Sequence, residues 1–257
     1  MSKNITTNLY QGTIKIEFFE EWTNPKTNRI NKHVYLVNGE RCPISVTGVT
    51  GMLDKPALIG WAVNLGRDYL LELAKNNTII TAQHILEAAK QHTIKKTKEA
   101  TSGTLVHEWA EQYIKEFNPA MPEDDRVTNG VIAFLDWIKE HQVQFIASEQ
   151  PVYSKQHQYV GIMDCKFTMG KEDHKIVHAG DFKTSSGIYN EMRYQVSAYQ
   201  AADAEESGCE YGNKWIVRFD KNTGGFEARE FPLAEHQDDL AAFLGLLAVK
   251  KREQELF

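Results

Sequence analysis

The sequence predicts an α/β fold, with a mixed central β-sheet flanked by helices and preceded by an N-terminal β-hairpin and a helical region. Three changes of pattern predict it. Residues 13–49 alternate apolar and polar side chains, the apolar residues recur every three or four positions from residue 56, and strand-like segments return from residue 145. Alternation is typical of half-buried strands, whereas a spacing of three and four is typical of amphipathic helices.

The N-terminal segment is expected to form a small antiparallel sheet or hairpin. TIKIEFF, HVYLV and ISVTGV show the alternation, and the turn-rich segments TNPKTN and NGE separate them. Because Asn, Gly and Pro favour tight turns, each of these separators is expected to reverse the chain.

Four helices are predicted next. The first covers residues 56–73, and the second follows Thr81, which is an N-cap residue type, to about Lys90. Ser102 begins the third, GTLVHEWAEQYIKEF, which the segment NPAMP ends. The fourth runs from about Asp125 to His141 and has its apolar side chains on one face.

The C-terminal part is predicted to form the main sheet. FIASEQPVYS, YVGIMDCKFTM and KIVHAGDFKTS are expected to be consecutive strands, followed by the helix NEMRYQVSAYQAADAEE. YGNKWIVRF and GFEAREF form a hairpin about DKNTGG, and an amphipathic helix closes the chain. We divide the chain at residue 100: residues 1–100 form the N-terminal region, packed on a core of residues 101–257.

Composition excludes several classes of protein. The net charge of −6 excludes a uniformly basic DNA-coating protein, although a local basic patch can still hold nucleic acid. The three cysteines lie far apart, which argues against a disulfide framework or a Cys-rich zinc site. No apolar run approaches the roughly 20 residues of a membrane span, and MSKNITTNLYQ lacks a secretory apolar segment. We therefore expect a cytoplasmic protein with no membrane contact.

The most informative stretch is GIMDCKFTMGKEDHKIVHAGDFKTS. Asp181 and Lys183 are two residues apart at the end of a predicted strand, so they face one side while Phe182 faces the core. If the strand carrying Asp164 pairs beside it, the two carboxylates converge, and such a pair repels unless a cation or a proton lies between them. Oxygen ligands of this kind suit Mg²⁺ or Mn²⁺. Alone, however, a DxK pattern is more often an ion pair at a strand end.

Five segments that follow one another in the chain make the DxK pattern more informative than it is alone. They are GTLVHEWAE with His107, SEQPV with Glu149, GIMD with Asp164, DFKTS with Asp181 and Lys183, and QVSAY with Gln195 and Tyr199. Between Gly103 and Tyr199 the chain resembles the RecB-like branch of the PD-(D/E)XK nucleases, which includes phage and mitochondrial exonucleases. The resemblance implies a restriction-endonuclease-like core.

The same resemblance implies roles for individual residues. His107, Asp164 and Asp181 would ligate the metal together with the backbone carbonyl of Phe182, and Lys183 would be catalytic. Gln195 and Tyr199 would support the site or touch DNA, although Tyr199 also fits a core position.

Three further assignments have alternatives. Glu149 could bind a second metal, orient water or pair with a basic residue, or be a protective charge on an edge strand. Glu111 shares a helix face with His107 but equally fits a solvated charge. Lys95, Lys96 and Lys98 precede the His107 helix and could contact DNA phosphates, although a charge run is more often a solvated face. His141, His174 and His178 fit no compact zinc motif.

The function expected from these residues is metal-dependent hydrolysis of DNA phosphodiester bonds. We expect an exonuclease of phage or bacterial recombination, repair or degradation, with DNA and a recombination or single-strand-annealing protein as partners. The alternatives are a catalytically inactive nuclease-fold module for DNA binding or assembly, and a site-specific endonuclease. Strand polarity, metal count and oligomeric state stay open.

Overall fold

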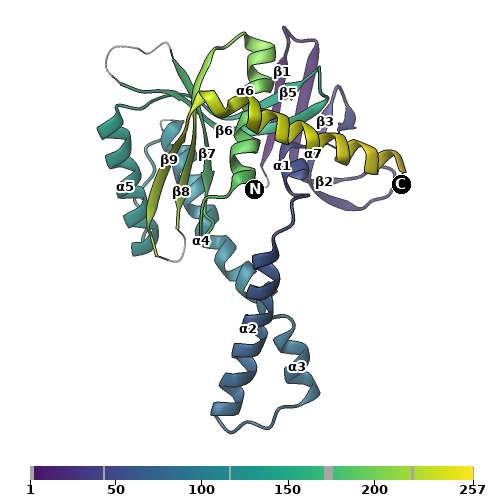
Figure 1. Cartoon of the computed structure of the whole chain (residues 1–257), viewed down its shortest axis with the longest axis vertical. Helices are drawn as coiled ribbons and strands as arrows, with labels where there is room; N and C mark the ends of the chain where they lie inside the picture. Colours follow the sequence, from purple (N-terminus) through teal and green to yellow (C-terminus); the bar gives the residue numbers. More distant parts are fainter. Residues whose placement is uncertain (1–2, 43, 116, 171–175, 221–222, 257) are drawn as a thin grey trace.

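The computed structural model describes residues 3–42, 44–115, 117–170, 176–220 and 223–256, apart from the side chains of residues 56–57, 96–104 and 256 (Figure 1). The chain is a mixed α/β protein, with an N-terminal four-stranded antiparallel sheet, a helical region and a five-stranded mixed sheet packed with helices. This confirms the predicted class. None of the helices in these ranges has the length and apolar composition that a bilayer crossing requires.

The N-terminal segment forms an antiparallel sheet, as predicted, and not a single hairpin. Its strands, in spatial order, are β1 (Asn4–Leu9), β2 (Ile14–Thr23), β3 (Ile30–Val37) and β4 (Glu40–Cys42). The prediction of a strand at ISVTGV is wrong, because α1 (Val46–Thr50) forms there. The Ser45 hydroxyl accepts a hydrogen bond from the Gly48 backbone N–H at 3.1 Å and so caps this short helix.

The helical region follows the prediction closely, with one exception. Its helices are α2 (Pro56–Lys75), α3 (Ala82–Ala88), α4 (Gln91–Ile114) and α5 (Asp125–His141). Helix α4 begins at Gln91, not at Ser102, because QHTIKKTKEATS contains no proline and Gly103 costs a long helix only about 1 kcal/mol. Residue 100 therefore lies inside α4. Figure 1 shows α2, α3 and the first part of α4 projecting from the two sheets as an arm.

The central sheet has the strand order β5-β6-β7-β8-β9. Its strands are β5 (Gln144–Ser154), β6 (Tyr159–Thr168), β7 (Val177–Lys183), β8 (Tyr211–Phe219) and β9 (Phe226–Phe231), and only the β7–β8 pair is parallel. The helices that follow are α6 (Asn190–Ser207), the short 3₁₀ turn η1 (Leu233–Glu235) and α7 (His236–Leu256).

Two apolar layers cover this sheet on its two faces. One joins the sheet to α1, α6 and α7 and includes Tyr159, Val196 and Phe243. The other joins it to α5 and the end of α4 and includes Phe134 and Phe182. Strand alternation therefore sends neighbouring residues of β7 to different layers, which is what allows a polar site beside the aromatic one.

The N-terminal sheet packs against the edge of the central sheet. A third apolar cluster joins Ile16, Phe18 and Tyr35 to Val160 of β6. The Val160 backbone N–H donates to the Ile44 carbonyl at 3.1 Å, and the Tyr10 hydroxyl donates to the Tyr153 carbonyl at 2.8 Å. The first strands of the chain are thereby held beside β5 and β6, where they can add residues to a site on the central sheet.

Phe134 tests the aromatic layer. This side chain is fully buried, and its ring contacts Phe182, Phe219 and other aromatic rings. We expect Phe134→Ala to lower the free energy of unfolding by about 3–5 kcal/mol, because the cavity left by a buried aromatic ring is not refilled. Urea denaturation measures this. Ile132→Ala, at an exposed position of α5, should stay within about 0.5 kcal/mol of the parent; equal losses would contradict the packing described.

Candidate functional site

The predicted site residues converge on one cleft. Its volume is about 310 Å³. Eight of the residues singled out from the sequence line it: His107, Glu149, Asp164, Asp181, Phe182, Lys183, Gln195 and Tyr199. They come from α4, β5, β6, β7 and α6, so segments distant in sequence are brought to one place.

The pairing of β6 with β7 brings the two aspartates together. The strands are antiparallel, with Cys165 opposite Gly180, so the next position of the register places Asp164 opposite Asp181. Directly opposed residues of an antiparallel pair have their Cβ atoms about 4.5–5.5 Å apart on the same side of the sheet. The ladder ends here, since the Phe182 backbone N–H donates to Asp164 Oδ2 at 2.7 Å instead. The expected convergence of the two carboxylates is confirmed.

His107 reaches the same point from the last part of α4. Its Nε2 lies 3.1 Å from the Phe182 carbonyl oxygen and 3.3 Å from Asp164 Oδ2. Because both neighbours are acceptors, Nε2 carries a proton in this arrangement. Burial lowers the pKa of His107, but the Asp164 carboxylate outweighs it and the net effect raises the pKa to about 9. An imidazole, a carboxylate and a backbone carbonyl thus meet here.

Asp181 is fully buried beneath Lys183. Its Oδ1 accepts a hydrogen bond from Gln195 Nε2 at 3.0 Å, and Gln195 Nε2 also donates to the Tyr199 hydroxyl at 2.9 Å. Its Oδ2 forms an ion pair with the Lys183 ammonium and has no other hydrogen-bond partner in the described part of the chain. Gln195 therefore orients the carboxylate, and Tyr199 steadies that amide from the core side.

A glycine of β6 leaves room for this support. A Cβ at Gly161 would lie 2.6 Å from a ring carbon of Tyr199, far inside van der Waals contact. Close packing therefore requires a glycine at this position of the GIMD segment. Any side chain there would displace the Tyr199 ring and, through Gln195, the Asp181 carboxylate.

The electrostatics of the two aspartates differ. Burial raises the pKa of Asp181 to about 7, with the Asp164 charge adding to the rise and the Lys183 ammonium opposing it. Burial acts in the same direction on Asp164, but His107 and Lys183 hold its pKa below the ordinary value. Two close buried carboxylates cannot both stay charged without compensation, and here protons and ammonium groups provide it.

Glu149 pairs with a basic residue, which is one of the roles expected for it. Its Oε2 lies 3.1 Å from the ammonium of Lys3, which also donates to Glu111 Oε2 at 2.7 Å. In β5, Ser148 and Gln150 pair with Cys165 and Met163 of β6, so Glu149 lies level with Asp164. The φ of Glu149, 52°, is in the left-handed region that non-glycine residues rarely adopt. Glu111 pairs with both Lys3 and Lys115 and is not among the residues that line the cleft in the described part of the chain.

Sequence analysis missed the wall that the N-terminal sheet contributes. Lys3, Phe18, Glu20, His33 and Tyr35 line the cleft from this sheet. The alternation in TIKIEFF and HVYLV predicted strands there, but no local pattern indicates which distant surface a sheet will cover. His33, like Glu149, has a positive φ, of 51°.

Lys95 does not line the cleft. Lys95 lies exposed on α4, twelve residues before His107 and so about 18 Å away along the helix axis. The side chains of Lys96 and Lys98 lie outside the described residues. Contact between this run and DNA stays a prediction.

The donor set fits a hard divalent cation in its chemistry. Asp164, Asp181 and the Phe182 carbonyl offer oxygen, and His107 offers nitrogen, which Mg²⁺ tolerates and Mn²⁺ accepts readily. Within the described ranges, however, no three His, Cys, Asp or Glu side chains already have the spacing of a metal site. Metal binding therefore requires Asp181 to exchange its contact with Lys183 for one with the ion, and His107 to release a proton.

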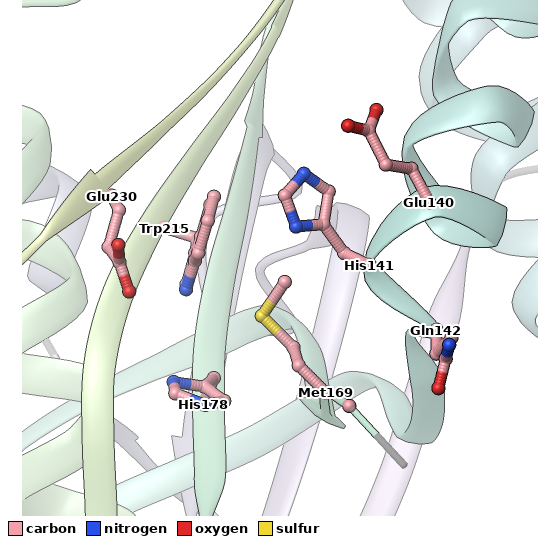
Figure 2. Close-up of a pocket in the computed structure, with 8 residues that line it drawn as sticks. Glu140, His141, Gln142, Met169, His178, Trp215 and Glu230 are labelled. Atoms are coloured by element: carbon pink, nitrogen blue, oxygen red, sulfur yellow. The ribbon is translucent and has the colours of Figure 1, made fainter.

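A second, larger hollow lies at the other end of the sheet. Its volume is about 640 Å³, and Figure 2 shows His141, Met169, His178 and Trp215 around it. The His178 ring stacks on Phe167, its Nδ1 lies 3.2 Å from the Asn213 carbonyl oxygen, and burial lowers its pKa. His141 packs against aromatic rings. These histidines have packing roles, so the chemistry centres on the smaller cleft.

The charge of His107 predicts how stability depends on pH. Because its folded-state pKa is raised to about 9, its contribution is complete below its ordinary value of 6.5 and is lost as the pH rises through 9. With EDTA present, we expect the unfolding free-energy difference between the parent and His107→Gln to be largest near pH 6 and to shrink towards pH 10. A difference that stays constant over this range would contradict the Asp164–His107 ion pair.

Comparison with known proteins gives no independent assignment. No protein-family profile matches the chain, and no curated protein matches it either. A functional conclusion therefore rests on the convergence of side chains in this cleft and on the order of the five segments.

Proposed function

We propose that this chain is a metal-dependent deoxyribonuclease of the RecB-like branch of the PD-(D/E)XK superfamily, with a restriction-endonuclease-like core in residues 101–257. One observation carries the proposal. His107, Asp164, Asp181 and Lys183 meet in a single cleft although they come from three separate elements. The five segments that resemble this branch thus supply neighbouring side chains and not scattered surface charges.

The reaction proposed is hydrolysis of a DNA phosphodiester bond. Asp164, Asp181, His107 and the Phe182 carbonyl would hold Mg²⁺ or Mn²⁺. When bound, the ion supplies Lewis acidity beside the scissile phosphate.

Lys183 acts on the phosphate. Its ammonium stands at the cleft with a side chain about one-fifth exposed, so it can reach a substrate from a fixed position. A positive charge there offsets the negative charge that develops on the phosphate and helps to orient the attacking water. Gln195 holds the Asp181 carboxylate in place through its amide, so that the carboxylate keeps its position when Lys183 turns from it to the phosphate.

The residues present favour an active enzyme over a nuclease-derived binding module. A binding module has no need of a buried aspartate whose second oxygen meets only a lysine, because burying a carboxylate is costly. The exonuclease assignment rests on the resemblance alone, and DNA topology tests it separately.

Lys183 tests the proposal most simply. We expect Lys183→Met to lower the rate of cleavage of end-labelled linear DNA in Mg²⁺ or Mn²⁺ by at least about a hundredfold, because it removes a charge from the transition state. Lys139→Met, at an exposed position of α5, is the matched control and should retain full activity. Circular dichroism of both variants checks that the fold is kept.

Two outcomes would count against the proposal. No cleavage of single- or double-stranded DNA by the parent protein in either metal would reject the enzyme and leave the binding module. Full activity of Lys183→Met would move the chemistry away from this cleft. Linear DNA should be degraded and covalently closed circles spared; equal cleavage of both would replace the exonuclease by an endonuclease.

A further inference from the structure

We infer that Lys3 is a tethered cation that fills a second cation position of the cleft, between Glu111 and Glu149, and thereby limits the site to one divalent ion. This inference rests on the proposed metal site. It assigns a role to the residue directly before the first strand, which no segment of the family resemblance includes.

The contacts of the Lys3 ammonium define the position. It lies 2.7 Å from Glu111 Oε2 and 3.1 Å from Glu149 Oε2, so it bridges a carboxylate of α4 and one of β5. Both oxygens meet the same nitrogen, and they are therefore close to one another. A carboxylate pair in this arrangement is held together by whatever cation lies between its members.

The backbone of Lys3 is held in place as well. Its N–H donates to Glu20 Oε2 at 2.9 Å, and its carbonyl accepts from the Glu20 N–H at 3.0 Å. The ammonium is consequently delivered by the edge of the N-terminal sheet and not by a freely moving end. A tethered charge competes with ions from solution at a high effective concentration.

The position is built to hold positive charge. Glu149 lies between Ser148 and Gln150, which pair with Cys165 and Met163 on either side of Asp164, and burial and the Asp164 charge raise the pKa of Glu149. The left-handed backbone of Glu149 adds strain of a kind that persists only where the surroundings fix it. In the same cleft, the fully buried Asp181 Oδ2 has only the Lys183 ion pair, which also indicates that the cleft is designed around cations.

Lys3 and a divalent ion are alternatives at this place. An ammonium sits about 2.7–3.1 Å from its oxygens, whereas Mg²⁺ demands oxygens at about 2.0–2.1 Å and carries twice the charge. Without the ammonium, Glu111 and Glu149 would be free to close around an ion. With it, their charge is already compensated, and a second ion would have to displace a lysine anchored at its backbone.

Counting bound Mn²⁺ tests this. Free Mn²⁺ is measured by electron paramagnetic resonance while metal-free protein is titrated with MnCl₂, with no DNA present. We expect one Mn²⁺ per chain for the parent protein and two for Lys3→Met, which keeps the apolar stem and removes the charge. Lys115→Met is the matched control, since Lys115 contacts Glu111 but not Glu149, and it should still bind one.

The double variant Lys3→Met/Glu149→Gln locates the second ion. It should return to one Mn²⁺ per chain, because the position then lacks a carboxylate. Circular dichroism and the melting temperature establish that each variant is folded; should Lys3→Met unfold, Lys3→Gln takes its place, with the same two ions expected.

The outcomes separate this inference from the proposed function. One ion in both the parent and Lys3→Met would overturn the role of Lys3 and leave the nuclease site standing. Two ions in the parent would overturn it equally, because Lys3 would not exclude the second. A second bound Mn²⁺ in Lys115→Met as well would overturn the specific role of Lys3, because the loss of any nearby positive charge would then have the same effect. No ion in the parent would reject the metal site itself.

Discussion

Strands β6 and β7 pair antiparallel, and their register holds Asp164 beside Asp181 at the end of the ladder. Neighbouring groups in the cleft compensate the charges of these two carboxylates. The Phe182 N–H and His107 compensate Asp164, while Lys183 and Gln195 compensate Asp181. Since burying uncompensated carboxylates costs several kcal/mol each, the site exists only because β7, α4 and α6 bring donors to it. If β7 shifted its register by one residue, the Asp164 and Asp181 side chains would lie on opposite faces of the sheet.

The cleft is therefore a charge-balanced assembly that a divalent ion can enter by exchange. Lys183 and Lys3 each hold carboxylates that could otherwise bind metal. The proton on His107, whose pKa is raised to about 9, likewise compensates Asp164. An entering ion would compensate the carboxylates in place of the lysines and the proton. The affinity for metal, the release of a proton and the position of the lysines are therefore linked. The aromatic layer on the other face, centred on Phe134 and Phe182, keeps the sheet rigid beneath them.

Local patterns predicted most of the elements and the heart of the site. Asp125–His141 is the predicted helix to the residue, and the two-residue spacing of Asp181 and Lys183 correctly placed both at the cleft with Phe182 behind. Three features of the structure were not predicted from the sequence. ISVTGV alternates like a strand, but the Ser45 cap makes a helix. Helix α4 starts earlier because nothing interrupts its polar first half. Lys3 carries no local signal, since only tertiary packing of the N-terminal sheet brings it to Glu111 and Glu149, over a hundred residues away.

The central claim is that a divalent cation binds where β6, β7 and α4 meet. Anomalous diffraction from crystals grown with Mn²⁺ tests it most directly, because manganese scatters anomalously and the protein's light atoms hardly do so. The account predicts a peak bonded to Asp164, Asp181, His107 Nε2 and the Phe182 carbonyl oxygen, with Lys183 turned away from Asp181. Crystals that show manganese elsewhere, or none in this cleft at saturating concentration, would contradict it.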